Sequence, residues 1–339
     1  MATLQTTKRT FLKGLATVPI VLSTSRANVA DAALLNVSFD TGRELFATLN
    51  AEFEAYWQRE NGQRISIDQS HAASSKQARA IMQGLRADVV TFSQELDVQV
   101  LADRGLISRD WQSAYPYSAS PFYTLPVFKV REENPKAIQD WSDLAREDVA
   151  VVMPNPRTSG AARYIYLSAY AYAERNFSGD QAAMANFLAA LFENVTVFDT
   201  GARGSTTTFV ERGLGDVLVT YEFEAANIQK DMIQSVFETV MPSVSIAADI
   251  KVAVLSRTLQ DERKARAAEA YLAFLFSNAA QNIAADLNYR VRDERVMSAN
   301  TDHFRNVALL TVESAFGGWR AAQQKHFSET GTLSRLFSL

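Results

Sequence analysis

The chain has 339 residues, enough for two lobes of roughly 100–200 residues that each bury a core. With 47% hydrophobic and 21% charged residues it has the composition of a soluble globular protein, and its net charge of −4 argues against a surface for nucleic acid or anionic membranes. The absence of cysteine excludes disulfides and thiolate zinc sites, and the three histidines lack metal-ligand spacing, so we expect no metal and no cofactor.

The N-terminal segment has the features of an export signal. An apolar run over 14–22 follows three basic residues, and Ala30 and Ala32 form a small-x-small cleavage site. The basic residues are Lys8, Arg9 and Lys13. We therefore expect a signal peptide over 1–32 and a periplasmic protein, because the apolar run is shorter than the ~20 residues of a membrane span. Residues 7–13 resemble a twin-arginine signal with Lys in place of the first Arg, which leaves the export route open.

The next segments alternate between short apolar strands and amphipathic helices. The first group comprises predicted strands at 34–39, 65–67 and 87–91 and predicted helices at 43–60 and 75–85. The second group comprises predicted strands at 149–152, 195–197 and 216–219 and predicted helices at 161–176, 181–192 and 205–212. This order predicts an α/β protein with two doubly wound sheets.

Two further segments, 122–130 and 246–255, are too extended and alternating for helices, and we expect them to be a pair of strands crossing between the lobes. The first lobe would then combine 33–118 with 250–339, and the second lobe would be 119–249. In such sheets ligands bind at the carboxyl ends of the strands. A binding site is therefore expected in the cleft between the lobes.

Three strand-to-helix loops, 69–77, 153–164 and 199–209, are rich in small and hydroxylated residues. The first N–H groups of a helix lack intrahelical partners, and the helix dipole adds positive charge there, so each loop could attract an anion. One such loop is also explained by ordinary helix capping, but three together predict an anion site made of neutral donors. Such a site would favour sulfate over phosphate, because phosphate keeps a proton that needs an acceptor.

Ten short motifs run in order along the chain. They are Asn36–Asp40, Asp68–His71, Lys76–Ala78, Ala87–Thr91, Pro154–Pro156, Thr158–Gly160, Gly201–Thr206, Gly213–Leu218, Tyr289–Asp293 and Phe316–Trp319. Together they resemble the periplasmic sulfate-binding proteins of ATP-binding-cassette sulfate/thiosulfate importers. The resemblance covers essentially the whole mature chain and implies a type II periplasmic binding-protein fold whose two lobes close over one dehydrated sulfate.

The resemblance also implies a set of ligands. The donors would be the backbone N–H groups of Asp40, Gly160, Ala161 and Ala202, the hydroxyls of Ser74 and Ser159, and the phenol of Tyr221, where the family usually has an indole. Four further residues are expected to support these donors without binding the anion: Ser70, Thr158, Arg163 and Arg203. The implied partner is a permease of the inner membrane, and the protein itself is expected to be a monomer.

Several residues depart from the family pattern. Tyr221 replaces the indole, Ala72 and Ala73 replace a pair of glycines, and Ala161 replaces a second glycine. A phenol donates from a different point than an indole, and each added Cβ takes space, so the cavity could differ in shape. Thiosulfate, another small sulfur oxyanion or a sulfonate therefore stays open beside sulfate.

An exported sulfur-ester hydrolase is a more remote alternative. Ser70 next to His71 suggests a nucleophile with its base, but no Gly-x-Ser-x-Gly elbow accompanies them, so we expect no catalytic residue and no enzyme. Glu222 and Glu224 would share one face at the end of a strand and are expected to face solvent or brace loops rather than to act as an acid/base pair. The aromatic stripe of helix 161–176 is expected to be core.

Overall fold

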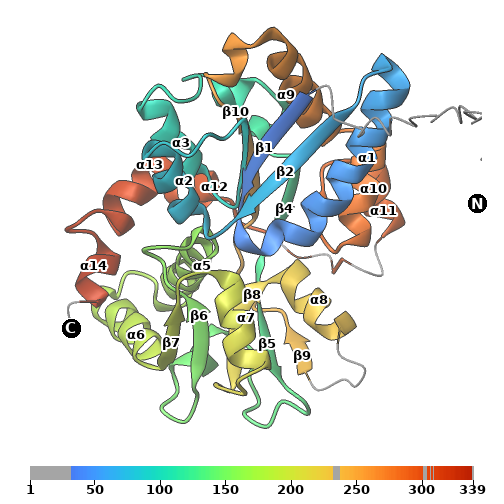
Figure 1. The fold of residues 1–339 in the computed structure, drawn as a ribbon. Helices are drawn as coiled ribbons and strands as arrows, with labels where there is room; N and C mark the ends of the chain where they lie inside the picture. The colour runs from blue at the N-terminus through green and yellow to red at the C-terminus, as the bar shows by residue number, and fades with distance from the viewer. Residues whose placement is uncertain (1–31, 232–236, 301–303, 306, 308, 338–339) are drawn as a thin grey trace, which may run out of the picture.

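The chain folds into two α/β units, seen one above the other in a computed structural model (Figure 1). The structure describes residues 32–231, 237–300, 304, 305, 307 and 309–337. The predicted signal peptide over 1–32 lies outside the described residues except for Ala32. Each unit is built on one mixed sheet, and this confirms the predicted α/β architecture with two sheets.

The first unit is built on a six-stranded sheet in the order β11-β4-β10-β3-β1-β2. Its strands are β1 (Ala32–Ser38), β2 (Ile65–His71), β3 (Val89–Phe92), β4 (Phe122–Thr124), β10 (Ala248–Val254) and β11 (Arg290–Val291). β1 pairs in parallel with β2 and β3, whereas β10 runs antiparallel to β3 and β4. The sheet core is apolar, and Val37, Val89 and Val90 are fully buried.

The second unit is built on a five-stranded sheet in the order β7-β6-β8-β5-β9. Its strands are β5 (Pro126–Arg131), β6 (Val151–Pro154), β7 (Val195–Asp199), β8 (Val217–Tyr221) and β9 (Phe237–Val240). β6 pairs in parallel with β7 and β8, and β5 is antiparallel to β8 and β9. The carboxyl ends of β6, β7 and β8 therefore lie at one edge of this sheet.

Helices cover both sheets. Those of the first unit are α1 (Arg43–Asn61), α2 (Ser74–Met82), α3 (Glu95–Asp103), α9 (Glu262–Phe274), α10 (Asn278–Asp286) and α11 (Glu294–Ala299). Those of the second unit are α5 (Gly160–Phe177), α6 (Gln181–Glu193), α7 (Ala202–Val210) and α8 (Glu222–Asp231). The other α-helices of the described residues are short: α4 (Pro116–Ala119), α12 (Val312–Phe316), α13 (Trp319–Ala322) and α14 (Thr332–Leu336). The predicted core stripe of α5, including Tyr164 and Leu167, is buried.

The chain crosses between the sheets twice. The predicted strand 122–130 is divided at Leu125, so that β4 belongs to the first sheet and β5 to the second. The predicted strand 246–255 corresponds to β10, which lies entirely in the first sheet, and the return crossing is made by residues 241–247 between β9 and β10.

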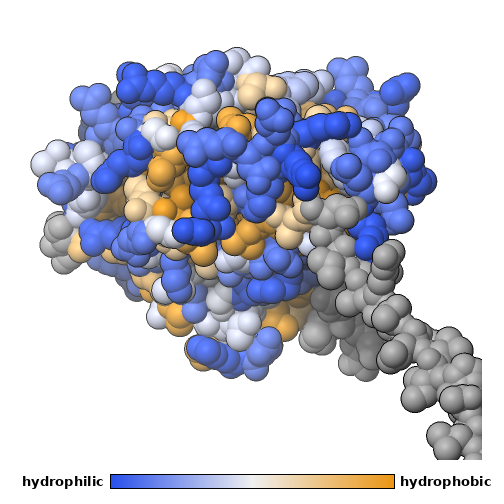
Figure 2. All heavy atoms as spheres, turned by 45° about the horizontal axis from the view of Figure 1, so that its top comes forward, coloured by the Kyte–Doolittle hydropathy of each residue, from blue (hydrophilic) through white to orange (hydrophobic). Residues whose placement is uncertain are grey.

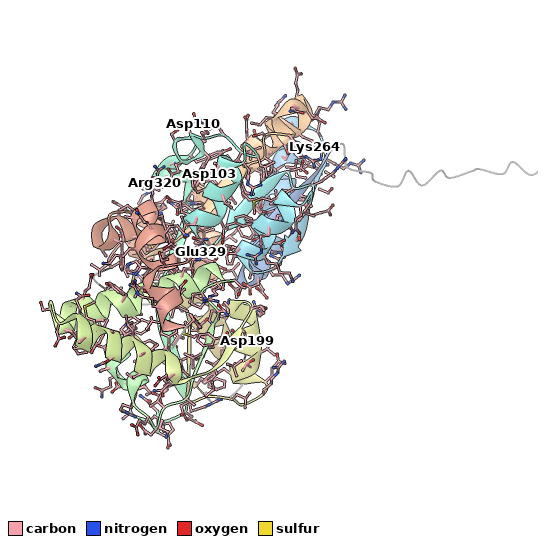
Figure 3. All side chains as sticks on the ribbon, turned by 90° about the vertical axis from the view of Figure 1, so that its left-hand side faces the viewer. Asp103, Asp110, Asp199, Lys264, Arg320 and Glu329 are labelled. Carbon is pink, nitrogen blue, oxygen red and sulfur yellow. The ribbon has the colours of Figure 1, made fainter. Side chains whose placement is uncertain are left out.

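The C-terminal segment 319–337 packs against the helices of the second unit. The rings of Trp319 and Tyr164 lie 5.0 Å apart, and those of Phe337 and Phe192 lie 5.8 Å apart. The buried imidazole of His326 contacts the Tyr166 hydroxyl at 3.0 Å. In the side view of Figure 3, Glu329 of this segment lies near the level at which the two units meet, and Asp199 lies within the second unit.

The face of the molecule drawn in Figure 2 is largely hydrophilic. Figure 2 shows polar side chains over most of one face of the molecule, with smaller apolar areas between them. Among the described residues, no helix has the length and apolar character that crossing a membrane requires.

Candidate binding site between the two sheets

All seven predicted ligand residues lie at the carboxyl end of a strand or at the start of a helix. Asp40 and Ser74 belong to the first unit, and Ser159, Gly160, Ala161, Ala202 and Tyr221 belong to the second. Apart from the half-buried Asp40, all of them are buried. The sequence therefore places these groups at the strand ends, where α/β folds bind their ligands.

The helices α2, α5 and α7 begin without a capping hydrogen bond from the side chain of their N-cap residue. Ala73 and Gly201 are the N-cap residues of α2 and α7, and neither side chain can accept a hydrogen bond. Ser159 is the N-cap of α5, but its hydroxyl makes no capping hydrogen bond. Among the described residues, six other helices are capped by their N-cap side chains, namely α3, α6, α9, α10, α11 and α12. The helices α1, α4, α13 and α14 also lack such a cap, but they carry none of the predicted ligand residues. A buried helix start without a cap leaves N–H groups for another partner.

The start of α7 faces Asp40 across the boundary between the units. The backbone N–H of Arg203 donates to Oδ2 of Asp40 at 3.2 Å, and that of Thr41 donates to Oδ1 at 3.1 Å. A Cβ on Gly201 would lie only 2.2 Å from Oδ2 of Asp40 and 3.4 Å from Cβ of Ala73. The first turn of α7 thus lies against both the Asp40 turn and the start of α2.

The start of α5 faces the segment that follows β3. A Cβ on Gly160 would lie 2.6 Å from Cγ of Gln94 and 2.7 Å from Oγ of Ser93. The Tyr221 hydroxyl, also from the second unit, donates to the Ser93 carbonyl at 3.5 Å. The structure therefore brings the three loops together and adds Ser93 and Gln94, which the sequence analysis missed because neither belongs to a hydroxyl-rich strand-to-helix loop.

The four predicted supporting residues contact neighbouring protein groups: a side-chain amide, loop carbonyls or carboxylates. Ser70 accepts a hydrogen bond from the Gln77 amide at 3.1 Å, and the Thr158 hydroxyl donates to the Thr200 carbonyl at 2.9 Å. Arg163 donates through Nε to the Pro156 carbonyl at 3.2 Å. Arg203 pairs with Glu44 of the first unit at 2.9 Å and lies 3.6 Å from Glu224.

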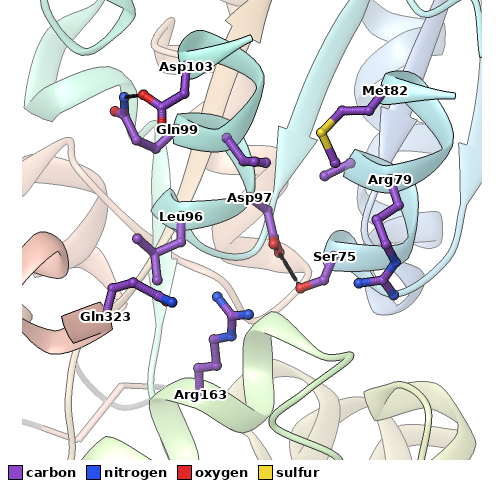
Figure 4. Close-up of a pocket in the computed structure, with 11 residues that line it drawn as sticks. Ser75, Arg79, Met82, Leu96, Asp97, Gln99, Asp103, Arg163 and Gln323 are labelled. Atoms are coloured by element: carbon purple, nitrogen blue, oxygen red, sulfur yellow. Dashed lines mark hydrogen bonds between the residues drawn. The ribbon is translucent and has the colours of Figure 1, made fainter. Parts of the chain in front are cut away.

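A pocket of about 360 Å³ lies beside the start of α2, between α2, α3 and the Arg163 side chain (Figure 4). Ser75 donates to both oxygens of Asp97 at 2.8 and 3.0 Å. Burial raises the pKa of Asp97, and the nearby Arg163 cation opposes this shift. This pocket contains charged side chains, in contrast to the neutral helix starts next to it.

The carboxyl group of Asp40 is also affected by burial. Burial raises its pKa, while the N–H groups of Arg203 and Thr41 act in the opposite direction by stabilising the carboxylate. Both of its oxygens already accept backbone hydrogen bonds.

Glu224 should make the stability of the protein depend on pH. Burial raises its pKa from 4.5 to about 7, against the opposing effect of the Arg203 cation. Between these values the folded chain holds a proton that the unfolded chain has lost, so the free energy of unfolding falls as the pH rises through this window. We expect Glu224 to contribute a loss on the order of 3 kcal/mol between pH 4.5 and pH 8.

Urea unfolding at pH 5 and pH 8 checks this expectation. The Glu224→Gln variant keeps an oxygen that can accept the Thr206 hydroxyl bond, which is 2.7 Å long in the native protein, but it cannot ionise. It should therefore lose much less stability than the native chain over the same pH range. Equal pH dependence in both proteins would show that Glu224 is not the group responsible.

Two other pairs of side chains that the sequence analysis considered are not brought together in the structure. The two ring nitrogens of His71 contact the Phe39 carbonyl and the Gln69 amide, so the imidazole does not contact Ser70. The prediction that Glu222 and Glu224 share a face at a strand end is wrong, because β8 ends at Tyr221 and residues two apart on α8 point in different directions. No cluster of metal-ligating side chains occurs among the residues that the structure describes.

Comparisons with known proteins identify the family of the chain. The model of the family of bacterial extracellular solute-binding proteins matches residues 37–289. A thiosulfate-binding protein of Escherichia coli (strain K12) is 48% identical over 313 residues, covering 92% of this chain and 93% of its own. A sulfate-binding protein of Salmonella typhimurium (strain LT2) is 43% identical over 317 residues, covering 94% and 96%. Among solved structures, the sulfate-binding protein SubI from Mycobacterium tuberculosis H37Rv has a TM-score of 0.79 and 29% identity, with 88% of this chain and 100% of that chain covered.

Proposed function

Because the chain belongs to the bacterial extracellular solute-binding proteins, we propose that it captures sulfate between its two units and delivers it to an ABC importer. The observation that carries this proposal is the convergence of three buried helix starts, those of α2, α5 and α7, whose N-cap side chains do not cap them. A dianion placed there would accept hydrogen bonds from N–H groups and hydroxyls while the helix dipoles stabilise its charge. The relatives named for sulfate binding support this ligand.

The ligands in this proposal are the backbone N–H groups of Asp40, Gly160, Ala161 and Ala202 and the hydroxyls of Ser74, Ser159 and Tyr221. Arg163 and Arg203 contribute charge and rigidity from outside this set, since their guanidinium groups contact loop carbonyls and carboxylates. The lobes that close on the anion are 33–118 with 250–339 and the inserted segment 119–249, except that β4 and the start of β10 belong to the first sheet and 319–337 packs on the second unit. The ligand leaves chemically unchanged, and the protein acts as a periplasmic monomer that presents the closed lobes to an inner-membrane permease.

Thiosulfate is the second candidate ligand. The relative named for thiosulfate binding is 48% identical to this chain, and a phenol at Tyr221 can accept as well as donate a hydrogen bond. Thiosulfate has the same charge as sulfate and replaces one oxygen by a larger, weaker acceptor. Ala161 and Tyr221, which differ from the family pattern, are both proposed ligands. They could therefore adapt the site to the larger sulfur atom of thiosulfate.

Calorimetric titration with sulfate, thiosulfate, phosphate and molybdate tests the function. We expect tight binding of sulfate, with phosphate weaker by about 10-fold to 100-fold because its proton would need an acceptor. A preference for thiosulfate over sulfate would favour the second candidate. No binding heat with either sulfur oxyanion would contradict the proposed function.

A further inference from the structure

Ser93 lies where three of the proposed ligand residues meet. It follows β3 directly, and its side chain is buried. Its Oγ lies 2.9 Å from Oγ of Ser74, in the first unit. From the second unit, Gly160 comes so close that a Cβ there would lie 2.7 Å from the same Oγ, and the Tyr221 hydroxyl reaches the Ser93 carbonyl.

The hydrogen bonds of the two serines leave one hydroxyl proton unused. Ser74 Oγ accepts the backbone N–H of Ser93 at 3.1 Å. The contact between the two hydroxyl oxygens uses one of their two protons, and either oxygen can be the donor. The remaining proton belongs to Ser93 when Ser74 donates within the pair, and to Ser74 when Ser93 donates.

We propose that Ser93 is a direct donor to the anion and that it exchanges this role with Ser74. The inference rests on the proposed function, because it assigns a further ligand to the same site. Ser93 Oγ adjoins the first residue of α5, whose N–H groups the anion would accept. The pair donates one hydrogen bond to the anion, from either of its two oxygens. The position of this donor can therefore change with the size of the bound anion, for example between sulfate and thiosulfate.

The exchange of roles has a specific energetic consequence. When either serine is replaced by alanine, the hydroxyl of the other is released from the pair and can donate to the anion. Each single substitution should therefore weaken binding only about 5-fold, whereas their combination removes the last hydroxyl of the pair and should weaken it more than about 100-fold. The combined loss would exceed the product of the single losses, which is the signature of two interchangeable donors.

The test is a calorimetric double-mutant cycle with Ser74→Ala, Ser93→Ala and the double variant, titrated with sulfate and with thiosulfate. Ser113→Ala, at an exposed serine outside the site, is the control and should bind like the native chain. Thermal unfolding without ligand checks that each variant is folded. Native affinity for the anion in Ser93→Ala would overturn the proposal. A double variant that binds as tightly as Ser74→Ala would also overturn it, because Ser93 would then only orient Ser74.

A crystal structure of Ser74→Ala with sulfate gives a second readout that does not need the double variant. We expect Ser93 Oγ at about 2.8 Å from a sulfate oxygen, and a Ser93 hydroxyl turned away from the anion would overturn the proposal. Titration of the native chain distinguishes a failure of the proposed function from a failure of the proposed role of Ser93. If the native chain binds neither anion, the proposed function fails and the role of Ser93 falls with it. If the native chain binds and Ser93→Ala binds equally well, only the role of Ser93 fails.

Discussion

Replacing Gly160 by alanine is expected to weaken anion binding by about 10-fold to 100-fold while the chain still folds. The new Cβ would lie 2.6 Å from Cγ of Gln94 and 2.7 Å from Oγ of Ser93, well inside normal contact distance. Both neighbours belong to the other unit. The methyl group would therefore hinder contact between the two units without disturbing the packing inside either one. Because Gly160 is not in a left-handed conformation, alanine adds no backbone strain.

Gly204→Ala is the matched control for this experiment. Gly204 lies in α7, and the nearest atom to its added Cβ would be Cβ of Asp199 at 3.1 Å, within the same unit. We expect its affinity to stay within about 3-fold of the native value, because the contact does not span the boundary. Calorimetry measures both variants. Native affinity in Gly160→Ala would mean that the anion does not bind between α5 and the segment after β3.

Replacing Arg290 by methionine is expected to lower the free energy of unfolding by about 3–5 kcal/mol. Arg290, on β11 of the first unit, donates to both carboxylate oxygens of Glu222 at the start of α8, at 2.6 and 2.9 Å. It also donates to the Arg305 carbonyl at 2.8 Å. Both side chains of the pair are nearly buried, so the substitution leaves the Glu222 carboxylate in a poorly solvated position without its cation.

Urea unfolding of three variants checks this prediction. The double variant Arg290→Met/Glu222→Met should recover most of the loss, because no uncompensated charge remains. Arg59→Met removes an arginine whose pair with Glu52 is exposed, and it should change stability by about 1 kcal/mol or less. If Arg290→Met were as mild as Arg59→Met, the pair between the units would contribute little to stability.

The sequence was most informative where a helix start carries strong local signals. The small and hydroxylated residues before α5 predict its beginning closely, at 161 against the observed Gly160, and the alternation of strands and helices predicts both sheets. Local patterns were less reliable where they are ambiguous. Residues 221–224 alternate like the end of a strand, but Glu222 begins α8, because tertiary packing overrides so short a pattern.

Contacts between distant segments could not be predicted from local patterns. Ser93 is a single serine after a buried strand, and its neighbours Gly160 and Tyr221 belong to the other unit. Its position depends on how the two sheets approach each other, and the spacing of apolar residues along the sequence does not indicate this. The packing of 319–337 on α5 and α6 has the same origin, since it depends on aromatic contacts such as that of Trp319 with Tyr164.

The central claim is that the anion binds to neutral donors at the starts of α2, α5 and α7. The most direct measurement is a crystal structure of the protein with selenate, a close analogue of sulfate whose selenium is located by anomalous scattering. We expect one strong selenium peak between these helix starts, with selenate oxygens about 2.9 Å from the backbone nitrogens of Gly160, Ala161 and Ala202. A peak bound instead to the guanidinium groups of Arg163 or Arg203 would contradict the account.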